Sequence, residues 1–476
     1  MMWNAIQRFG TMILSFCTNI ILARLLTPED FGCIGMLTIF LAISEVFIDG
    51  GFATALIQKK NTTQEDYSTI FYWNIIVSSF FFLLLELCAP YIADFYHMPQ
   101  LCPIMRVLSV VLIINGFTVV QTNILTKKLS FQLIAKIRLF AAFIAMSVAI
   151  LAAYLGMGVW SLVLNSILSA LIGSILFWFY NKWRPTLGFS RKSFKELFPF
   201  GGIMLLSNIA NSLFEHLQGL VIGRLYTSRD LGLYSQSKRL DQIVTSSLSS
   251  VVTQVSFPVL AQVADDNKRL VNAIRKNIVA TTYIIFPLQV LLITVAEPLI
   301  LTLFTDKWAE AIPYYQIMCI YGMFISLNAI NSNVYKALGK GKVYFFVQLT
   351  KRFFGIALLL ICSKYGVIGI TWSIAISGIV WWIFTASINT RILNYGIFKQ
   401  IRDIYRHSLI AIGLGLIVFY MLRFLNFQPL ITLLIVVPFY CISFLGLSSL
   451  LKLEGFQLLK TEVLDKYIHG LKKVKN

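Results

Sequence analysis

Polar side chains recur at helical spacing inside two apolar segments that lie 200 residues apart. The first stripe consists of Arg8, Thr11, Ser15 and Thr18, and the second consists of Asn208, Asn211, Glu215 and Gln218. Steps of three, four and three residues place each set on one face of a helix. Hydroxyl and amide groups can bind a polar ligand, but they are costly to bury against lipid. We therefore predict that the two stripes face each other across a hydrated cleft and bind the ligand there.

Three cations could give such a cleft a positive potential: Arg8, Lys238 and Arg239. A charge in the middle of a membrane costs at least about 2.5 kcal/mol and is rarely tolerated on a lipid face, so these residues are candidates for binding an anionic group. Two structural alternatives remain. Arg8 could anchor the start of its helix by snorkelling to the membrane surface, and Lys238 could form an i,i+3 pair with Asp241.

Three carboxylates, Glu45, Asp49 and Asp241, are candidates for ion coupling, either as counter-ions of the cations or as proton carriers. Asp49 directly precedes two glycines, so a capping role or a pair with Lys59 is the alternative there. Glu215 lies deepest in its apolar segment, and we place it with the ligand-binding stripe.

No catalytic arrangement accompanies these residues. The four histidines, His97, His216, His407 and His469, are far apart in the chain, and the sequence has neither metal-ligand spacing nor a glycine-rich phosphate loop. The seven cysteines are scattered without metal-ligand spacing, and we interpret them as small hydrophobic residues. We therefore predict that the chain is not an enzyme and needs no cofactor or metal ion.

The elements that must position the polar residues are membrane helices. Of the 476 residues, 58% are hydrophobic and only 13% are charged, which leaves too few polar side chains to cover a soluble protein. Long apolar runs such as 409–422 lack the alternation of barrel strands, so an all-α integral membrane protein is predicted. The 40 Lys and Arg, against 21 Asp and Glu, lie between the apolar segments, which argues against a nucleic-acid partner.

A window of about 20 apolar residues per span predicts about 14 transmembrane helices. They are centred near residues 14, 44, 80, 113, 144, 169, 210, 246, 288, 322, 353, 380, 414 and 439. Most Lys and Arg fall at the two ends and in the connections that follow even-numbered helices, so the positive-inside rule predicts that both termini are cytoplasmic. The basic tail, 454–476, is predicted to lie on the anionic inner leaflet.

An internal repeat relates the two halves of the chain. The segment RLLTPEDFG (24–32) aligns without a gap on RLYTSRDLG (224–232), with five of nine positions identical. In each copy a threonine can cap the following helix and an aspartate three residues later completes a capping box. The register of 200 also holds for the two polar stripes, which makes the match more than a common capping turn.

Equivalent helices are an even number apart, so the two halves enter the membrane in the same direction and form a parallel repeat. We predict two six-helix bundles with a polar cleft between them. The predicted organisation is an N-lobe at 1–180, a basic cytoplasmic linker at 181–196, a C-lobe at 197–395, two further helices at 396–453 and the tail.

Four motifs carry a family resemblance across essentially the whole chain. They are LARLLTPEDFG (22–32), GGFATALIQ (50–58), GMGVWSLV (156–163) and LGLYS (231–235). In this order they resemble the Wzx-like polysaccharide transporters of the multidrug/oligosaccharidyl-lipid/polysaccharide flippase superfamily.

The resemblance implies a bacterial inner-membrane flippase that moves undecaprenyl-pyrophosphate-linked oligosaccharides by alternating access, for lipopolysaccharide, capsule or exopolysaccharide synthesis. The cations would then attract the diphosphate, and the amide and hydroxyl side chains would bind sugars. Membrane lipids and the polymerase and chain-length proteins of such a pathway are candidate partners. Two alternatives stay open: an ion-coupled drug or metabolite antiporter of the same superfamily, and a membrane polysaccharide polymerase or ligase.

Overall fold

The computed structural model describes the backbone of residues 2–424 and 427–460, and their side chains except those of 2, 4–6, 8, 246–257, 259 and 424. In the described residues all regular secondary structure is helical and no strand occurs, which confirms the all-α prediction. Every predicted helix centre lies within a helix. In the described residues 11 helical segments are long and apolar enough to cross a membrane, and one of them, Gly341–Leu393, contains two helices joined by a single 3₁₀ turn. The count of 14 crossings stays a prediction.

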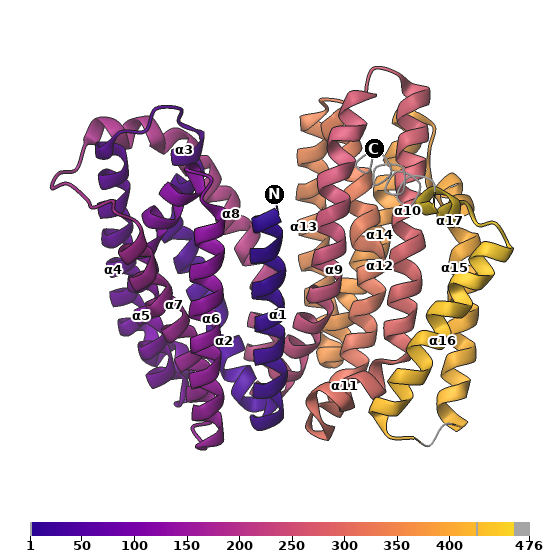
Figure 1. Cartoon of the computed structure of the whole chain (residues 1–476), viewed down its shortest axis with the longest axis horizontal. Coiled ribbons are helices and arrows are strands. Elements are labelled where there is room, and N and C mark those ends of the chain that lie inside the picture. Colours follow the sequence, from indigo (N-terminus) through magenta and orange to yellow (C-terminus); the bar gives the residue numbers. More distant parts are fainter. Residues whose placement is uncertain (1, 425–426, 461–476) are drawn as a thin grey trace, which may run out of the picture. The chain divides into compact units, whose positions relative to one another are not determined.

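The first of two compact units covers Met1–Ser235 (Figure 1). Its elements are α1 (Met2–Leu25), α2 (Pro28–Asp49), α3 (Phe52–Gln58), α4 (Gln64–Phe95), α5 (Leu101–Lys127), α6 (Phe131–Tyr154), α7 (Val159–Tyr180), α8 (Arg191–Leu225) and the first two turns of α9 (Ser228–Gln262). Within this unit α1 packs against α6, α5 packs against α4 and α7, and α8 packs against α2. The helices α2 and α4 to α7 have little amphipathic contrast, because helices in a membrane are apolar on most faces.

The second compact unit covers Gln236–Asn476. After the rest of α9 it contains α10 (Asn267–Thr294), α11 (Ala296–Phe304), η1 (Asp306–Ala311), α12 (Ile312–Ala337), α13 (Gly341–Cys362), η2 (Ser363–Tyr365), α14 (Gly366–Leu393), α15 (Ile397–Phe424), α16 (Pro429–Leu450) and α17 (Glu454–Leu459). Contacts therefore divide the chain at Ser235, inside α9, whereas the repeat suggests a division at the linker 181–196. α8 belongs by contact to the first unit, where it lies against α2, α3 and α4.

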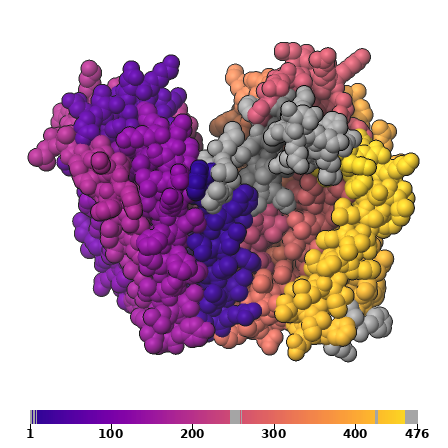
Figure 2. Space-filling view, viewed as in Figure 1, coloured from indigo at the N-terminus to yellow at the C-terminus, as the bar shows by residue number. Residues whose placement is uncertain are grey.

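The two C-terminal helices are integral to the second unit. Apolar side chains of α15 and α16 form a buried cluster with Tyr283 and Leu291 of α10. Arg275 on α10 adds ion pairs to Asp403 of α15 and Glu454 of α17. On their other sides α15 and α16 expose large apolar residues such as Leu416 and Leu434. Figure 2 draws the surface of these two helices in yellow. This surface is suited to contact with lipid acyl chains.

Both copies of the repeated turn form the predicted capping box. In the first copy Asp30 Oδ2 accepts the Thr27 backbone N–H at 3.0 Å, and the Thr27 hydroxyl oxygen accepts the Asp30 N–H. In the second copy Asp230 Oδ2 accepts the Thr227 N–H at 3.1 Å, and the Thr227 hydroxyl oxygen accepts the Asp230 N–H. The repeat is therefore one of three-dimensional structure as well as of sequence.

The two turns also pack on each other within the first unit. We call residues 27–32 and 227–232 the turn pair. A Cβ atom added to Gly32 would lie 1.8 Å from the carbonyl oxygen of Ser228, and one added to Gly232 would lie 1.8 Å from the carbonyl oxygen of Pro28. Residues 28 and 228, like 32 and 232, are equivalent positions in the repeat, so the contact is reciprocal. Only glycine allows backbones to approach so closely.

Candidate binding pocket in the first unit

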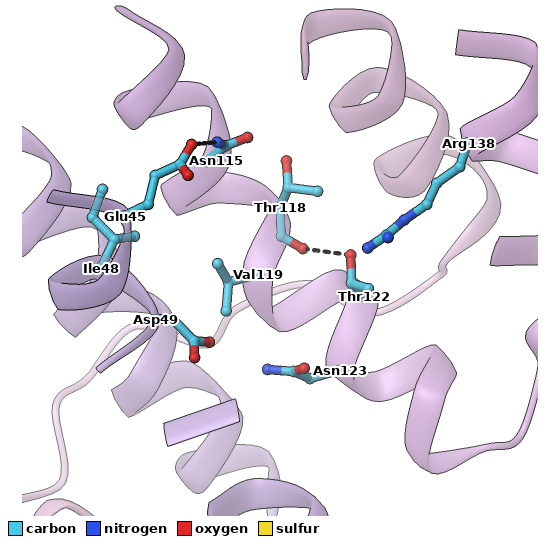
Figure 3. A pocket seen from close by; sticks show the side chains of 9 residues that line it. All are labelled: Glu45, Ile48, Asp49, Asn115, Thr118, Val119, Thr122, Asn123 and Arg138. Atoms are coloured by element: carbon cyan, nitrogen blue, oxygen red, sulfur yellow. Dashed lines mark hydrogen bonds between the residues drawn. The ribbon is translucent and has the colours of Figure 1, made fainter. Parts of the chain in front are cut away.

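A polar pocket of about 310 Å³ lies among α2, α5 and α6 of the first unit (Figure 3). Its lining consists of Glu45, Ile48, Asp49, Asn115, Thr118, Val119, Thr122, Asn123 and Arg138. Seven of these nine side chains are polar or charged. In helices of membrane length, polar groups of this kind mark a place that binds something other than lipid.

The end of α2 positions the two carboxylates. Glu45 and Asp49 are one helical turn apart on the same face. α2 stops directly after Asp49 because Gly50 and Gly51 both adopt left-handed backbone angles, with φ of 56° and 67°. Glu45 Oε1 accepts a hydrogen bond from Asn115 Nδ2 at 3.0 Å. The Asp49 carboxylate receives no hydrogen bond from the described residues, so both of its oxygens can accept bonds from a ligand.

One face of α5 supplies most of the remaining polar groups. Asn115, Thr118 and Thr122 follow at steps of three and four residues. The hydroxyls of Thr118 and Thr122 donate to backbone carbonyls one turn earlier, at 2.8 Å and 3.1 Å, which leaves their oxygen lone pairs for a ligand. Asn123 is 8% exposed, and its buried Nδ2 has no hydrogen-bond partner among the described residues. Figure 3 shows this amide pointing toward the side of the pocket where Asp49 lies.

A single cation from α6 completes the pocket. Arg138 extends toward Thr122, with its guanidinium on the opposite side from the two carboxylates (Figure 3). The pocket thus offers hydrogen-bond donors on one side, acceptors on the other and hydroxyls between them. Nowhere in the described residues do three His, Cys, Asp or Glu side chains converge as a metal ion would require.

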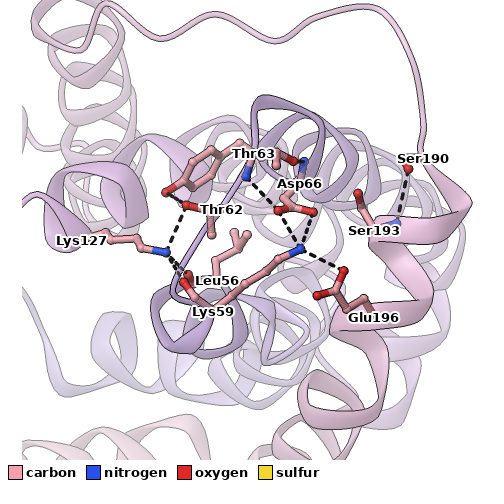
Figure 4. Close-up of polar contacts among 10 residues, drawn as sticks. Leu56, Lys59, Thr62, Thr63, Asp66, Lys127, Ser190, Ser193 and Glu196 are labelled. Carbon is pink, nitrogen blue, oxygen red and sulfur yellow. Dashed lines mark hydrogen bonds and ion pairs between the residues drawn. The ribbon is translucent and has the colours of Figure 1, made fainter.

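A polar cluster fixes the segment that follows α3 (Figure 4). Lys59 Nζ lies 2.9 Å from Asp66 Oδ2 and 3.0 Å from Glu196 Oε2 of α8. The sequence-based pairing of Lys59 with Asp49 is therefore wrong: Lys59 extends to the start of α4, and Asp49 lines the pocket. Burial alone would lower the pKa of Lys59, but the hydrogen bonds and charges of Asp66 and Glu196 raise it.

Lys127, at the end of α5, binds the same segment from the other side. Its ammonium group donates to the backbone carbonyls of Leu56 and Lys59 and to the Thr62 hydroxyl. The first two carbonyls belong to the end of α3, where no helical N–H remains to bond them. This cluster holds the end of α3 against α4, α5 and α8, and so fixes the glycine break that ends α2 beside the pocket.

The predicted stripes lie on α1 and α8. Thr11 and Ser15 are on α1, and the Thr11 hydroxyl donates to the Gln7 carbonyl at 2.7 Å. α8 carries the second stripe: Asn208, Asn211, Glu215 and Gln218. Arg8 is in α1, but its side chain lies outside the described residues. That the two stripes face each other and bind a ligand stays a prediction.

The remaining predicted residues belong to the second unit. Lys238 is half-buried and Arg239 exposed on α9. Asp241 is 5% exposed, and the Thr245 hydroxyl lies 3.3 Å from its Oδ2. Gln289 of α10 approaches this carboxyl group. Thus Glu45 and Asp49 share one pocket, and Asp241 lies in a different cluster.

The comparisons with known proteins identify the family. Residues 21–313, more than half of the chain, match the family described as "Polysaccharide biosynthesis protein". The chain belongs to this polysaccharide biosynthesis family.

Two curated relatives are similar over most of their length. The teichuronic acid biosynthesis protein TuaB of Bacillus subtilis (strain 168) is 26% identical over 88% of this chain and 87% of its own. The lipopolysaccharide biosynthesis protein WzxC of Escherichia coli (strain K12) is 26% identical over 78% of this chain and 76% of its own.

Solved structures confirm the fold of this family member. The lipid II flippase MurJ, in an inward closed conformation, has a TM-score of 0.75 at 18% identity, over 94% of this chain and 99% of its own. An inward-facing multidrug resistance MATE transporter of the MOP superfamily has a TM-score of 0.62 at 16% identity, over 81% of this chain and 95% of its own. The chain has the all-α transporter fold that these two proteins share.

Sequence reasoning missed the other five polar residues of the pocket in this polysaccharide biosynthesis protein: Asn115, Thr118, Thr122, Asn123 and Arg138. The signal was present for three of them. The steps from 115 to 118 to 122 have the same three-and-four spacing that identified the stripes on α1 and α8. Arg138 gave no such signal, because it and Lys136 are cations near the start of an apolar helix, where basic residues are common at a membrane surface.

Proposed function

We propose that the chain is a flippase that moves undecaprenyl-pyrophosphate-linked oligosaccharide repeat units across the bacterial inner membrane by alternating access. The cargo would serve lipopolysaccharide, capsule or exopolysaccharide synthesis. The observation that carries the proposal is a polar pocket built from membrane-length helices in a member of a polysaccharide biosynthesis family. A lipid headgroup that is both charged and rich in hydroxyls needs such a polar environment, because hydrocarbon supplies no hydrogen bonds.

In this proposal the diphosphate is drawn by Arg8, Lys238 and Arg239. Charge-assisted hydrogen bonds to several cations offset the desolvation of the diphosphate. Binding must stay weak, because a carrier that holds its cargo tightly in one conformation slows its release. The polyprenyl tail would stay in the lipid. Ion coupling would use protons carried by Glu45, Asp49 or Asp241.

The charge distribution supports a direction of transport. Both termini and the linker 181–196 are proposed to be cytoplasmic, where the cargo is assembled, under the positive-inside rule. The basic tail from residue 454 would bind the anionic inner leaflet; its part beyond residue 460 lies outside the described residues.

The flippase proposal is tested with purified full-length protein in liposomes. The probe is a polyprenyl diphosphate that bears a disaccharide with a dithionite-sensitive dye on its terminal sugar. Dithionite bleaches only outward-facing dye, so a flippase increases the bleached fraction above the roughly half seen in protein-free liposomes. Uptake of a fluorescent organic cation against a proton or sodium gradient is measured in parallel.

Movement of the disaccharide probe supports the proposal. Uptake of the cation without movement of the lipid would instead identify an antiporter, which the similarity of fold to a MATE transporter makes the second candidate. Appearance of longer saccharides on the probe would identify a polymerase or ligase. Either of the last two results overturns the proposal.

The cations give a residue-level prediction. Lys238→Gln and Arg239→Gln each remove one positive charge from α9, so we expect each to slow flipping of the disaccharide probe by about three- to tenfold without changing the amount of protein in the liposomes. Lys268→Gln, in the first turn of α10, is the matched control. If both α9 variants flip the probe as fast as the unchanged protein, these cations serve packing or topology instead.

A further inference from the structure

We propose that the pocket of α2, α5 and α6 is a saccharide subsite: it binds one or two sugar rings of the cargo, while the diphosphate binds elsewhere. This inference rests on the proposed function and names the part of the cargo that the pocket recognises. Three features support it: the charges of the lining residues, the buried Asn123 amide, and the volume and apolar surface of the pocket.

The charges of the pocket exclude the diphosphate. Glu45 and Asp49 bring two carboxylates, and Arg138 brings the one guanidinium of the lining. A diphosphate would therefore meet more like charge than opposite charge, at distances where screening by water is weak. Anion sites are normally built from several cations or backbone N–H groups, and this lining has neither.

The donors of the pocket argue against a bound cation. Metal ions and alkali cations are bound by oxygen atoms that surround them. Here the Arg138 guanidinium and the buried Asn123 Nδ2, which has no partner in the described part of the chain, both present N–H groups to the same space as the carboxylates. A cation at the carboxylates would leave the buried Asn123 donor unsatisfied, which costs about as much as a lost hydrogen bond.

A sugar satisfies both kinds of group. Each sugar hydroxyl donates one hydrogen bond and accepts others, so neighbouring hydroxyls can donate to Asp49 and Glu45 and accept from Asn123 and Arg138. The apolar side chains of Ile48 and Val119 offer a surface for the C–H face of a pyranose ring. The cavity, about 310 Å³, is at the small end of small-molecule sites, which suits one or two rings.

Two threonines of α5 allow an experiment to separate an effect on the pocket from an effect on the helix. Thr122 donates to the Thr118 carbonyl at 3.1 Å, and Thr126 donates to the Thr122 carbonyl at 2.9 Å. Both are half-buried on α5, but only Thr122 lines the pocket. Substitution of either one removes the same kind of backbone hydrogen bond, so a difference between the two variants reports the pocket alone.

The first experiment measures occupancy. Thr122→Cys and Thr126→Cys proteins in liposomes are treated with a thiol-reactive methanethiosulfonate, and modification of each cysteine is followed by peptide mass spectrometry. The reaction is repeated with the disaccharide-bearing polyprenyl diphosphate, with the sugar-free polyprenyl diphosphate and with added sodium chloride. We expect the disaccharide lipid alone to slow modification of the cysteine at 122 by about threefold or more, with no change at 126.

The second experiment measures transport. Thr122→Val and Asn123→Leu each remove a hydrogen-bonding group, so flipping of the disaccharide probe should slow by about three- to tenfold at low probe density and recover at saturating density. Thr126→Val should flip it at the rate of the unchanged protein.

The outcomes separate the two proposals. Equal protection by the sugar-free lipid would mean that the diphosphate or tail occupies the pocket, and protection by sodium would mean a cation site; either overturns the subsite. If the unchanged protein flips the probe but neither cysteine is protected and both pocket variants flip normally, the subsite is wrong and the flippase stands. If the unchanged protein does not flip the probe, the proposed function itself fails.

Discussion

At the scale of single residues, Lys59 forms one buried and one exposed ion pair, whose contributions to stability can be compared. Its partner Asp66 has a side chain only 1% exposed, whereas its partner Glu196 is 56% exposed. Lys59→Met leaves a buried carboxylate without its cation and should destabilise the protein by about 3–5 kcal/mol. Glu196→Gln removes only an exposed pair, worth about 0–1 kcal/mol. Thermal unfolding in detergent, followed with a thiol-reactive dye, should show a clear loss for the first variant and little for the second.

The same pair predicts a pH dependence. Because the pKa of Lys59 is raised in the folded protein, its contribution to stability is complete below the ordinary lysine pKa of about 10.4 and is lost only as the pH rises above it. The difference in stability between the unchanged protein and Lys59→Met should therefore stay constant from about pH 6 to pH 9. A difference that shrinks within this range would mean that another group controls the cluster.

The residue scale also shows the limit of sequence reasoning. The capping residues Thr27 and Asp30 were predictable because their partners are three positions away. The alternative pair of Lys59 with Asp49 was wrong, because Asp66, seven residues away, and Glu196, 137 residues away, reach Lys59 only through the packing of the end of α3 against α4 and α8. Asn123 was missed for a related reason: its importance comes from being buried without a partner, which only the packing of α2, α5 and α6 determines.

At the scale of elements, the turn pair predicts equal effects at two distant positions. A methyl group at Gly32 or at Gly232 would meet a backbone carbonyl at 1.8 Å, so both Gly→Ala variants must shift the turns apart. We expect a cost of about 1–3 kcal/mol for each, as for other overpacked sites. Thermal unfolding of the purified protein measures it, and Cys33, buried next to the turn, would become reactive at a lower temperature.

Gly413→Ala is the control for this pair, since a Cβ there meets nothing within 4 Å. It should leave the protein unchanged or slightly more stable, because alanine favours a helix over glycine. If Gly32→Ala and Gly232→Ala differ widely from each other, the reciprocal contact does not form in solution.

Hydropathy predicted the positions of the helices well, because a membrane span needs a long apolar run and little else. It did not predict which helices pack together. The internal repeat assigns α8 to the second half of the chain, yet this helix packs against α2 and α3 of the first unit. There Gly51 lies close to the Gly201 carbonyl. Such contacts depend on the shape of small residues in three dimensions, which a composition window does not detect.

At the scale of the whole molecule, α15 and α16 are predicted to be required for folding. A chain that ends at residue 395 would uncover Tyr283 and Leu291 and remove both acidic partners of Arg275. We expect this truncation to aggregate on size-exclusion chromatography in mild detergent, while the full chain gives a single peak. A monodisperse truncated protein would mean that the two helices only cover lipid-facing surface.

Topology is the second property of the whole molecule that can be tested. If the linker 181–196 is cytoplasmic, a cysteine introduced at Ser190 should not react with an impermeant maleimide in intact cells and should react after the membrane is opened. A cysteine at Ser228, which is half-buried in the turn at the other end of α8, should react in both conditions. Labelling of the linker in intact cells would reverse the proposed orientation.

The turn pair has a consequence for the symmetry of the molecule. Its contact is isologous: each position of one copy meets its equivalent, or the neighbours of its equivalent, in the other. In a dimer of identical chains, position 29 would face itself, and two glutamates or two arginines would repel. Here the equivalent residues are Glu29 and Arg229, whose side chains lie 3.1 Å apart. Joining the copies in one chain lets the two sides of a symmetric contact diverge, so opposite charges can meet where a homodimer could place only like ones.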